Sequence, residues 1–126
     1  MQVSTGANSR KFFPQPGWAE HDAEKIWETQ RQSIEAALKH ASADWSDIET
    51  IGIANQRETI VIWNREWGKP IANATVWQDR RTASHCESLK ADGKEERIQS
   101  KTGDLLDPCF SATKISWLLD MITGAR

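Results

Sequence analysis

The sequence predicts a mixed α/β domain, and three observations lead to that prediction. A long stretch at 22–42 carries apolar residues at helical spacing. Three runs rich in β-branched residues follow, at 48–54, 59–63 and 70–77. The remainder of the chain, 80–126, returns to helical spacing. The whole chain has 126 residues, which is the length of one domain.

The composition indicates a globular protein and argues against nucleic-acid-binding and membrane proteins. Hydrophobic residues make up 38% of the chain and charged residues 27%, which is typical of a globular domain rather than a disordered one. A formal net charge of −2 argues against a protein that binds nucleic acid by neutralising phosphates. No apolar run is long enough for a transmembrane helix, so we expect no membrane partner. The two cysteines lack metal-site spacing and no signal-peptide pattern is present, which favours a cytoplasmic protein.

The N-terminal part is expected to contain a leader, a turn and the longest helix. Residues 1–11 are small and polar, and we expect a poorly ordered leader there. Two phenylalanines at 12–13 are expected to end a short strand. The Pro-Gln-Pro-Gly run at 14–17 then favours a turn, because proline fixes the backbone angle φ. Asp22 is a good N-cap for the helix over 22–42.

The three β-rich runs are expected to form a small β-meander over 48–78, with helices on its flanks. Gly68 lies between the second and third runs, in a segment typical of a hairpin turn. Pro70 begins the third run, where its missing N–H is tolerated.

Three shorter helices are expected after the meander. Asp79 is a candidate N-cap for a helix over 80–92, and a polar helix follows at 94–101. Ser111 is a candidate N-cap for the last helix. The apolar stripe expected on that helix comprises Ile115, Leu118, Leu119 and Ile122.

The best candidate for chemistry is the polar run at 55–58, Asn-Gln-Arg-Glu, between the first two expected strands. Arg57 offers a planar fork of donors and Glu58 accepts, and a vicinal diol needs both because each hydroxyl donates and accepts. Trp77 ends the third expected strand, where its ring can cover the C–H face of a polyol. The alternative is a surface ion pair between Arg57 and Glu58, which composition and spacing alone favour.

A second polar run, Asp-Arg-Arg at 79–81, has the charge to hold a phosphate. The simpler interpretation is a helix cap followed by two solvated or ion-paired arginines. The sequence contains no glycine-rich loop with phosphate-binding spacing and no self-contained catalytic motif.

Several sequence blocks resemble the FGGY family of carbohydrate kinases, and within it the glycerol kinase branch. They occur in the family's order and spacing and together cover 12–126. The blocks are 16–22 (PGWAEHD), 51–59 (IGIANQRET), 68–71 (GKPI), 76–82 (VWQDRRT), 106–108 (LDP), 110–111 (FS) and 113–120 (TKISWLLD).

The resemblance implies a partial ribonuclease-H-like domain of the actin/hexokinase superfamily, a truncated N-terminal kinase domain over 12–126 with the family's first two strands missing. The complete enzyme would use ATP and Mg²⁺ to transfer a phosphoryl group to a terminal hydroxyl of glycerol. The family's catalytic Asp and its nucleotide domain are expected outside this chain. We therefore expect the 126 residues alone to be inactive and to bind neither ATP nor Mg²⁺ tightly.

The resemblance also implies which residues bind glycerol. Arg57 and Glu58 would contact its hydroxyls, and Trp77 would pack against its carbons. Cys109 stands where the family has Tyr, so a phenol contact is lost and weak glycerol binding is expected. Ala112 stands where the family has Gly, which crowds the same region.

Two other interpretations of the chain stay open. One is a non-catalytic remnant that binds no ligand. The other is an interaction module, in which an unpaired sheet edge associates with a second copy or with a complementing kinase fragment.

Overall fold

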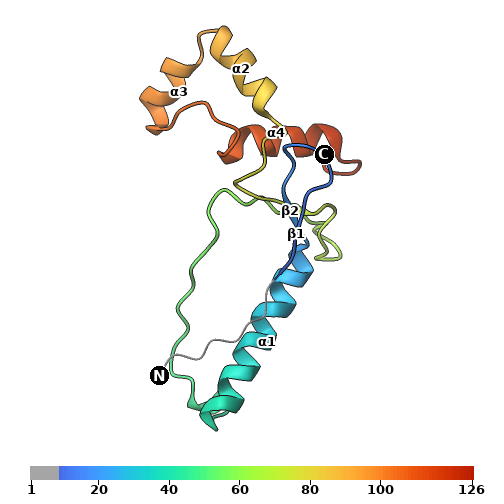
Figure 1. The fold of residues 1–126 in the computed structure, drawn as a ribbon, viewed down its shortest axis with the longest axis vertical. Helices are drawn as coiled ribbons and strands as arrows, with labels where there is room; N and C mark the ends of the chain where they lie inside the picture. The colour runs from blue at the N-terminus through green and yellow to red at the C-terminus, as the bar shows by residue number, and fades with distance from the viewer. Residues whose placement is uncertain (1–8) are drawn as a thin grey trace.

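The computed structural model describes residues 9–126, and this part of the chain combines four α-helices with one small sheet (Figure 1). The predicted mixed α/β class is confirmed. Most of the predicted leader, 1–8, lies outside the described residues. The helices are α1 (Ala23–Ala41), α2 (Ala83–Ala91), α3 (Glu95–Thr102) and α4 (Ser111–Met121), with a 3₁₀ turn η1 (Trp45–Asp47). The strands are β1 (Lys11–Phe12), β2 (Glu20–His21) and β3 (Ala74–Thr75).

The sheet is antiparallel throughout, in the order β1-β2-β3. Lys11 of β1 pairs with His21 of β2, and His21 pairs in turn with Ala74 of β3. The predicted turn at 14–17 joins β1 to β2. Gly17 has a φ of 81° there, in the left-handed region that glycine adopts without steric strain.

The predicted meander over 48–78 is largely wrong, because two of its three strands do not form as expected. In the described part of the chain the run at 48–54 pairs with no strand, and Ile53 is 91% exposed. The run at 59–63 contributes only two isolated bridges, Ile60 with Thr75 and Trp63 with Pro70. Strand propensity reflects packing against neighbours, and the neighbours of β3 are supplied mainly by the N-terminal strand β2.

The hairpin turn predicted around Gly68 is present. The backbone N–H of Asn64 donates to Lys69 O at 2.8 Å, and Gly68 has a φ of 64°. This turn joins the two residues of the Trp63–Pro70 bridge, and the chain then runs on to β3.

The longest helix, α1, begins where the sequence predicts. Oδ1 of Asp22 accepts hydrogen bonds from the backbone N–H groups of Glu24 at 2.9 Å and Lys25 at 3.1 Å. From its start beside β2, the helix projects away from the sheet and from α2, α3 and α4 (Figure 1). Its predicted apolar stripe is accordingly uncovered in part, with Trp27 68% exposed and Ile34 42% exposed.

The core lies where β3 meets α2 and α4. Val76, Cys86 and Leu118 are buried there, and the hydroxyls of Thr82 and Thr113 lie 2.9 Å apart between α2 and α4. The predicted stripe on α4 is partly wrong, because Ile115 is 41% exposed while the polar residues Thr113 and Lys114 are buried beside Leu118.

Two predicted helix caps are also wrong. Thr82, not Asp79, precedes α2, and it makes no side-chain capping bond. Ser111 is the first residue of α4 rather than its cap. Both predicted capping side chains have tertiary partners instead. Within residues 9–126, no helix is both long enough and apolar enough to cross a membrane.

Candidate functional site

Three turns from distant parts of the sequence carry the candidate site. The first spans 56–59, where Thr59 N–H donates to Gln56 O at 3.4 Å. The second spans 76–79, where Asp79 N–H donates to Val76 O at 3.0 Å. The third spans 107–110, where Phe110 N–H donates to Asp107 O at 3.1 Å.

The four residues singled out in the sequence lie on these turns and line one cavity of about 410 Å³. Arg57 and Glu58 come from the first turn, Trp77 from the second and Cys109 from the third. Gln56 and Phe110 complete the lining. The cavity therefore combines a donor fork, a carboxylate acceptor and two aromatic rings, which is a set suited to a small polyhydroxy compound.

Glu58 is the residue of this cavity whose conformation is most constrained. Its φ is 60°, a left-handed conformation that is rare for a residue with a long side chain. Its carboxylate Oε2 accepts a hydrogen bond of 2.6 Å from the Ser111 hydroxyl. A carboxylate has about four acceptor positions, so Glu58 keeps acceptor capacity for a ligand.

The interpretation of Arg57 and Glu58 as a surface ion pair finds no support. None of the ion pairs recorded for residues 9–126 joins these two side chains. Arg57 is exposed and Glu58 is half-buried. The guanidinium and the carboxylate are thus both available at the cavity rather than neutralising each other.

Lys114 lies beneath the cavity with no exposed surface. Its ammonium donates to the backbone carbonyl of Glu58 at 2.5 Å and to that of Cys109 at 2.5 Å. A longer contact of 3.5 Å reaches the carbonyl of Val76. Burial lowers the pKa of Lys114 from its ordinary value, against the effect of nearby Cys109 and Glu58.

The second polar run of the sequence, 79–81, does not form an open phosphate site. Arg81 donates to both carboxylate oxygens of Asp79, at 2.8–2.9 Å, and to Glu20 Oε1 at 2.7 Å. The Arg81 guanidinium also stacks 3.9 Å above the ring of Trp18 and 4.6 Å from that of Trp117. All of these contacts are internal, so Arg81 connects β2 to α4 and has a structural role.

Arg80 points elsewhere and pairs only weakly, with 3.6 Å between its Nη1 and Asp107 Oδ2. Its side chain is 58% exposed. The alternative of two solvated or ion-paired arginines therefore describes 80–81 better than a phosphate site does, although Asp79 does not cap α2.

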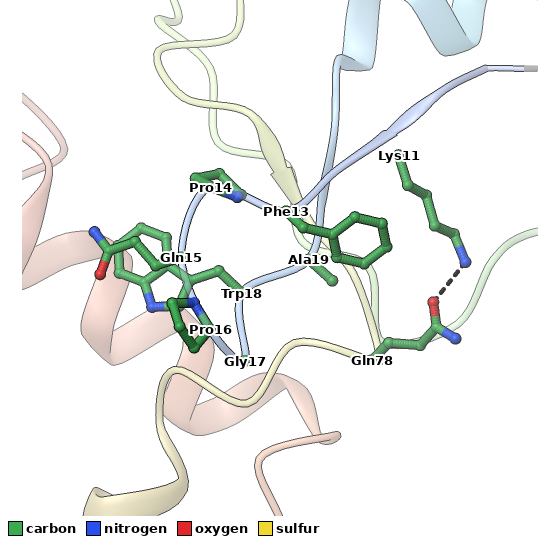
Figure 2. Close-up of a pocket in the computed structure, with 9 residues that line it drawn as sticks. All are labelled: Lys11, Phe13, Pro14, Gln15, Pro16, Gly17, Trp18, Ala19 and Gln78. Atoms are coloured by element: carbon green, nitrogen blue, oxygen red, sulfur yellow. Dashed lines mark hydrogen bonds between the residues drawn. The ribbon is translucent and has the colours of Figure 1, made fainter.

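A second and larger cavity, of about 660 Å³, lies at the turn between β1 and β2 (Figure 2). Figure 2 shows Phe13, two prolines and Trp18 around it, with Lys11 reaching across to Gln78. Its lining contains no carboxylate and none of the predicted site residues. The smaller cavity at the three turns is therefore the better candidate for chemistry.

The described residues do not fit a bound metal ion. Within 9–126, no group of three or more His, Cys, Asp or Glu side chains is arranged to hold one. The candidate cavity offers a single carboxylate, from Glu58.

Sequence reasoning missed two residues that shape the site. Lys114 falls inside a block that resembles the family, but its helix was expected to bury an apolar stripe. Ser111 was expected to cap α4. The sequence did contain one indication of this role: Lys114 is spaced to share a helical face with the apolar residues Trp117 and Leu118.

Comparison with known proteins agrees with the resemblance seen in the sequence. The model for the N-terminal domain of the FGGY family of carbohydrate kinases matches residues 2–125. A glycerol kinase of Allorhizobium ampelinum is 54% identical over 125 residues, which is 98% of this chain and 25% of the relative. A glycerol kinase of Parabacteroides distasonis is 56% identical over 117 residues, or 93% of this chain and 23% of the relative.

A solved structure is similar as well. The crystal structure of Plasmodium falciparum glycerol kinase with ADP has a TM-score of 0.84 and 35% sequence identity. The match covers 94% of this chain and 24% of that one. The chain thus spans about a quarter of the length of the relatives it matches.

Proposed function

The chain belongs to the FGGY family of carbohydrate kinases, and from this premise we propose that it forms part of the glycerol-binding pocket of a glycerol kinase. The observation that supports the proposal is the single cavity lined by Arg57, Glu58, Trp77 and Cys109. The proposed reaction of the whole protein is phosphoryl transfer from ATP to glycerol, with Mg²⁺ as the usual metal of such transfers. The proposed place of action is the cytoplasm, in keeping with the free thiols of Cys86 and Cys109.

In the proposed complex, two adjacent hydroxyls of glycerol meet Arg57 and Glu58. The guanidinium of Arg57 donates a hydrogen bond to one hydroxyl oxygen, and the carboxylate of Glu58 accepts a hydrogen bond from a hydroxyl. Hydrogen bonds to charged partners are stronger than neutral ones, which favours the diol over a ligand with a single hydroxyl. The ring of Trp77, which is 47% exposed at the cavity, has room to cover the carbon chain.

The proposed affinity is low. Each hydrogen bond to a small polyol contributes about 0.5–1.5 kcal/mol net, because water is displaced. These contributions must also offset the loss of ligand freedom. A dissociation constant on the order of 1 mM or weaker follows, equivalent to about −4 kcal/mol. Cys109 contributes to this weakness, since a thiol is a poorer hydrogen-bonding group than a phenol.

Phosphoryl transfer is proposed to require more than these 126 residues. Transfer needs in-line positioning of phosphate, metal and a group that takes the hydroxyl proton. The described residues provide no metal ligand set, and the sequence has no glycine-rich phosphate loop. A coupled assay on the 126-residue chain is expected to show no glycerol-dependent ADP release above a mock preparation. Release above that level would contradict this part of the proposal.

A second candidate function, association with another chain, is favoured by one observation. The β-rich run at 48–54 has no strand partner among residues 9–126, with Ile51 77% exposed and Ile53 91% exposed. Such a segment can pair with a strand of a second copy or of a complementing kinase fragment. Size-exclusion chromatography with light scattering tests this. A monomer at every concentration, with no gain in mass on adding such a fragment, would argue against it.

The experiment that tests the glycerol proposal is an NMR titration of isotope-labelled protein. Glycerol is expected to shift the Trp77 indole N–H and the amides of Arg57 and Glu58 along saturable curves. The control ligand is 1,3-propanediol, which has three carbons but no vicinal diol. If glycerol and the control produce the same unsaturable drift up to molar concentration, the cavity does not bind glycerol.

A further inference from the structure

Lys114 connects all three turns of the candidate site from below. The carbonyl oxygens that it contacts belong to Glu58 in the turn at 56–59, Cys109 in the turn at 107–110 and Val76 in the turn at 76–79. Two of these residues line the cavity themselves, and Val76 directly precedes Trp77. One buried side chain therefore contacts the backbone of every wall of the cavity.

We propose that Lys114 is a positioning residue that holds the three turns in the geometry that binds the ligand. The proposal rests on the proposed glycerol function and extends it to a residue that lies outside the cavity lining. Lys114 would act through the backbone of Glu58, Cys109 and Val76, and would not touch the ligand.

The chemistry of the side chain fits this role. An ammonium carries three donors in a tetrahedral arrangement, and here it has three carbonyl acceptors on three separate segments. Arginine also has several donors, but they lie in one plane and fit a single planar partner best. An apolar side chain of similar length would fill the space without the cost of burying a charge. Burial lowers the pKa of Lys114, which reflects that cost.

Glu58 is the residue that needs this support most. Its φ of 60° is unfavourable for a side chain with a Cβ, and such conformations persist only when surrounding contacts fix them. Lys114 holds its carbonyl at 2.5 Å, while Ser111 holds its carboxylate at 2.6 Å. Both of these contacts come from α4, so this helix fixes the backbone and the side chain of Glu58 together.

The test compares Lys114→Met with Lys101→Met in the full 126-residue chain. Methionine keeps the length of the buried stem and removes all three donors. Lys101 is an exposed residue of α3 and serves as the matched control. Two readouts are measured at a temperature where each variant is folded: glycerol affinity by NMR, and the rate at which iodoacetamide alkylates Cys109. Peptide mapping separates that thiol from buried Cys86.

The positioning role predicts that Lys114→Met weakens glycerol binding at least tenfold and changes the Cys109 alkylation rate at least threefold. Lys101→Met is expected to change neither. A purely structural role would lower the unfolding midpoint of Lys114→Met but leave both readouts at wild-type values, and that result would overturn the proposal.

If Lys114→Met does not fold, a second variant, Lys114→Arg, tests the positioning role. Lys114→Arg keeps the charge and loses the tetrahedral donor geometry, so wild-type values of both readouts in the folded variant would overturn the proposal. Failure of both variants to fold would overturn it too, because Lys114 would then be required by the core as a whole.

If the wild-type chain binds no glycerol, the proposed glycerol function is contradicted. That result alone does not contradict the positioning role of Lys114. The alkylation rate and the amide shifts of Arg57, Glu58 and Trp77 between wild type and variant need no ligand. These readouts therefore test the role of Lys114 independently of glycerol binding.

Discussion

The hydroxyl of Ser111 donates a hydrogen bond of 2.6 Å to Oε2 of Glu58, across 53 positions of sequence. This bond joins the first residue of α4 to the turn at 56–59. It fixes Oε2 of the carboxylate, and Oε1, which accepts no hydrogen bond from residues 9–126, can accept from a ligand. The first turn of α4 therefore helps to orient the acceptor at the candidate site.

Removal of that hydroxyl is expected to weaken glycerol binding without unfolding the protein. In Ser111→Ala the carboxylate of Glu58 loses its partner and samples more orientations, so affinity should fall about 2–10-fold, equivalent to about 0.5–1.5 kcal/mol. Ser116→Ala is the matched control, because Ser116 lies on the same helix and makes only a 3.5 Å contact with Asp120. NMR titration checks both. Equal affinities would show that the hydroxyl does not orient Glu58.

Loss of the charged acceptor itself is expected to have a larger effect. Glu58→Gln keeps the shape of the side chain but replaces a charge-assisted hydrogen bond with a neutral one, which is roughly half as strong. Glycerol affinity, followed by the shift of the Trp77 indole N–H, should fall about tenfold or more, equivalent to about 1.4 kcal/mol. Glu66→Gln, in the exposed turn at 64–69, is expected to bind as the wild type does. Unchanged binding by Glu58→Gln would remove Glu58 from the site.

A tyrosine at position 109 is expected to tighten binding. The phenol adds a donor and acceptor at the cavity wall and should gain about 0.5–1.5 kcal/mol, or up to about tenfold in affinity. Cys109→Ser is the control, because it changes the polar atom without extending the side chain into the cavity. Isothermal titration calorimetry compares the two variants. If Cys109→Tyr binds no better than Cys109→Ser, the side chain at 109 does not face the ligand.

Arg81→Met is expected to destabilise the fold strongly. The Arg81 side chain is 3% exposed, and its removal leaves the buried carboxylates of Asp79 and Glu20 unpaired. Breaking a buried pair in this way costs about 3–5 kcal/mol. Arg80→Met removes an exposed pair at 3.6 Å and should cost about 0–1 kcal/mol. Urea denaturation measures the difference, and similar midpoints for the two variants would contradict the structural role of Arg81.

Stability is expected to fall as the pH drops below 6.5, the ordinary pKa of histidine. Burial and the nearby charge of Lys11 lower the pKa of His21 in the folded state. The unfolded chain then binds more protons than the folded one between the two pKa values, so acid favours unfolding there. The loss is complete below the folded-state pKa. His21→Gln should flatten this part of the curve, whereas the variant of exposed His85, His85→Gln, should not.

The candidate site could be predicted only in part. The residues alone gave a donor fork and an acceptor at Arg57 and Glu58, but their spacing favoured a surface ion pair. Trp77 was placed beside them as the end of the third expected strand, the family resemblance added Cys109, and all four residues line one cavity. Lys114 could not be found this way, because its role depends on three carbonyl groups from three separate turns.

Local structure was determined by the sequence itself. Asp22 begins α1 and Gly103 ends α3 with a φ of 80°, because capping and left-handed turns depend on groups within a few residues. Tertiary structure alone decided where other polar groups bond. Ser111 has the chemistry of a cap, yet its hydroxyl bonds to the distant carboxylate of Glu58. The carboxylate of Asp79 accepts from the backbone N–H of Ala19, 60 positions away, and from Arg81, so it joins parts of the fold instead of capping α2. The strand expected at 48–54 did not form for a different reason: a strand needs hydrogen-bonding neighbours, and the run itself cannot supply them.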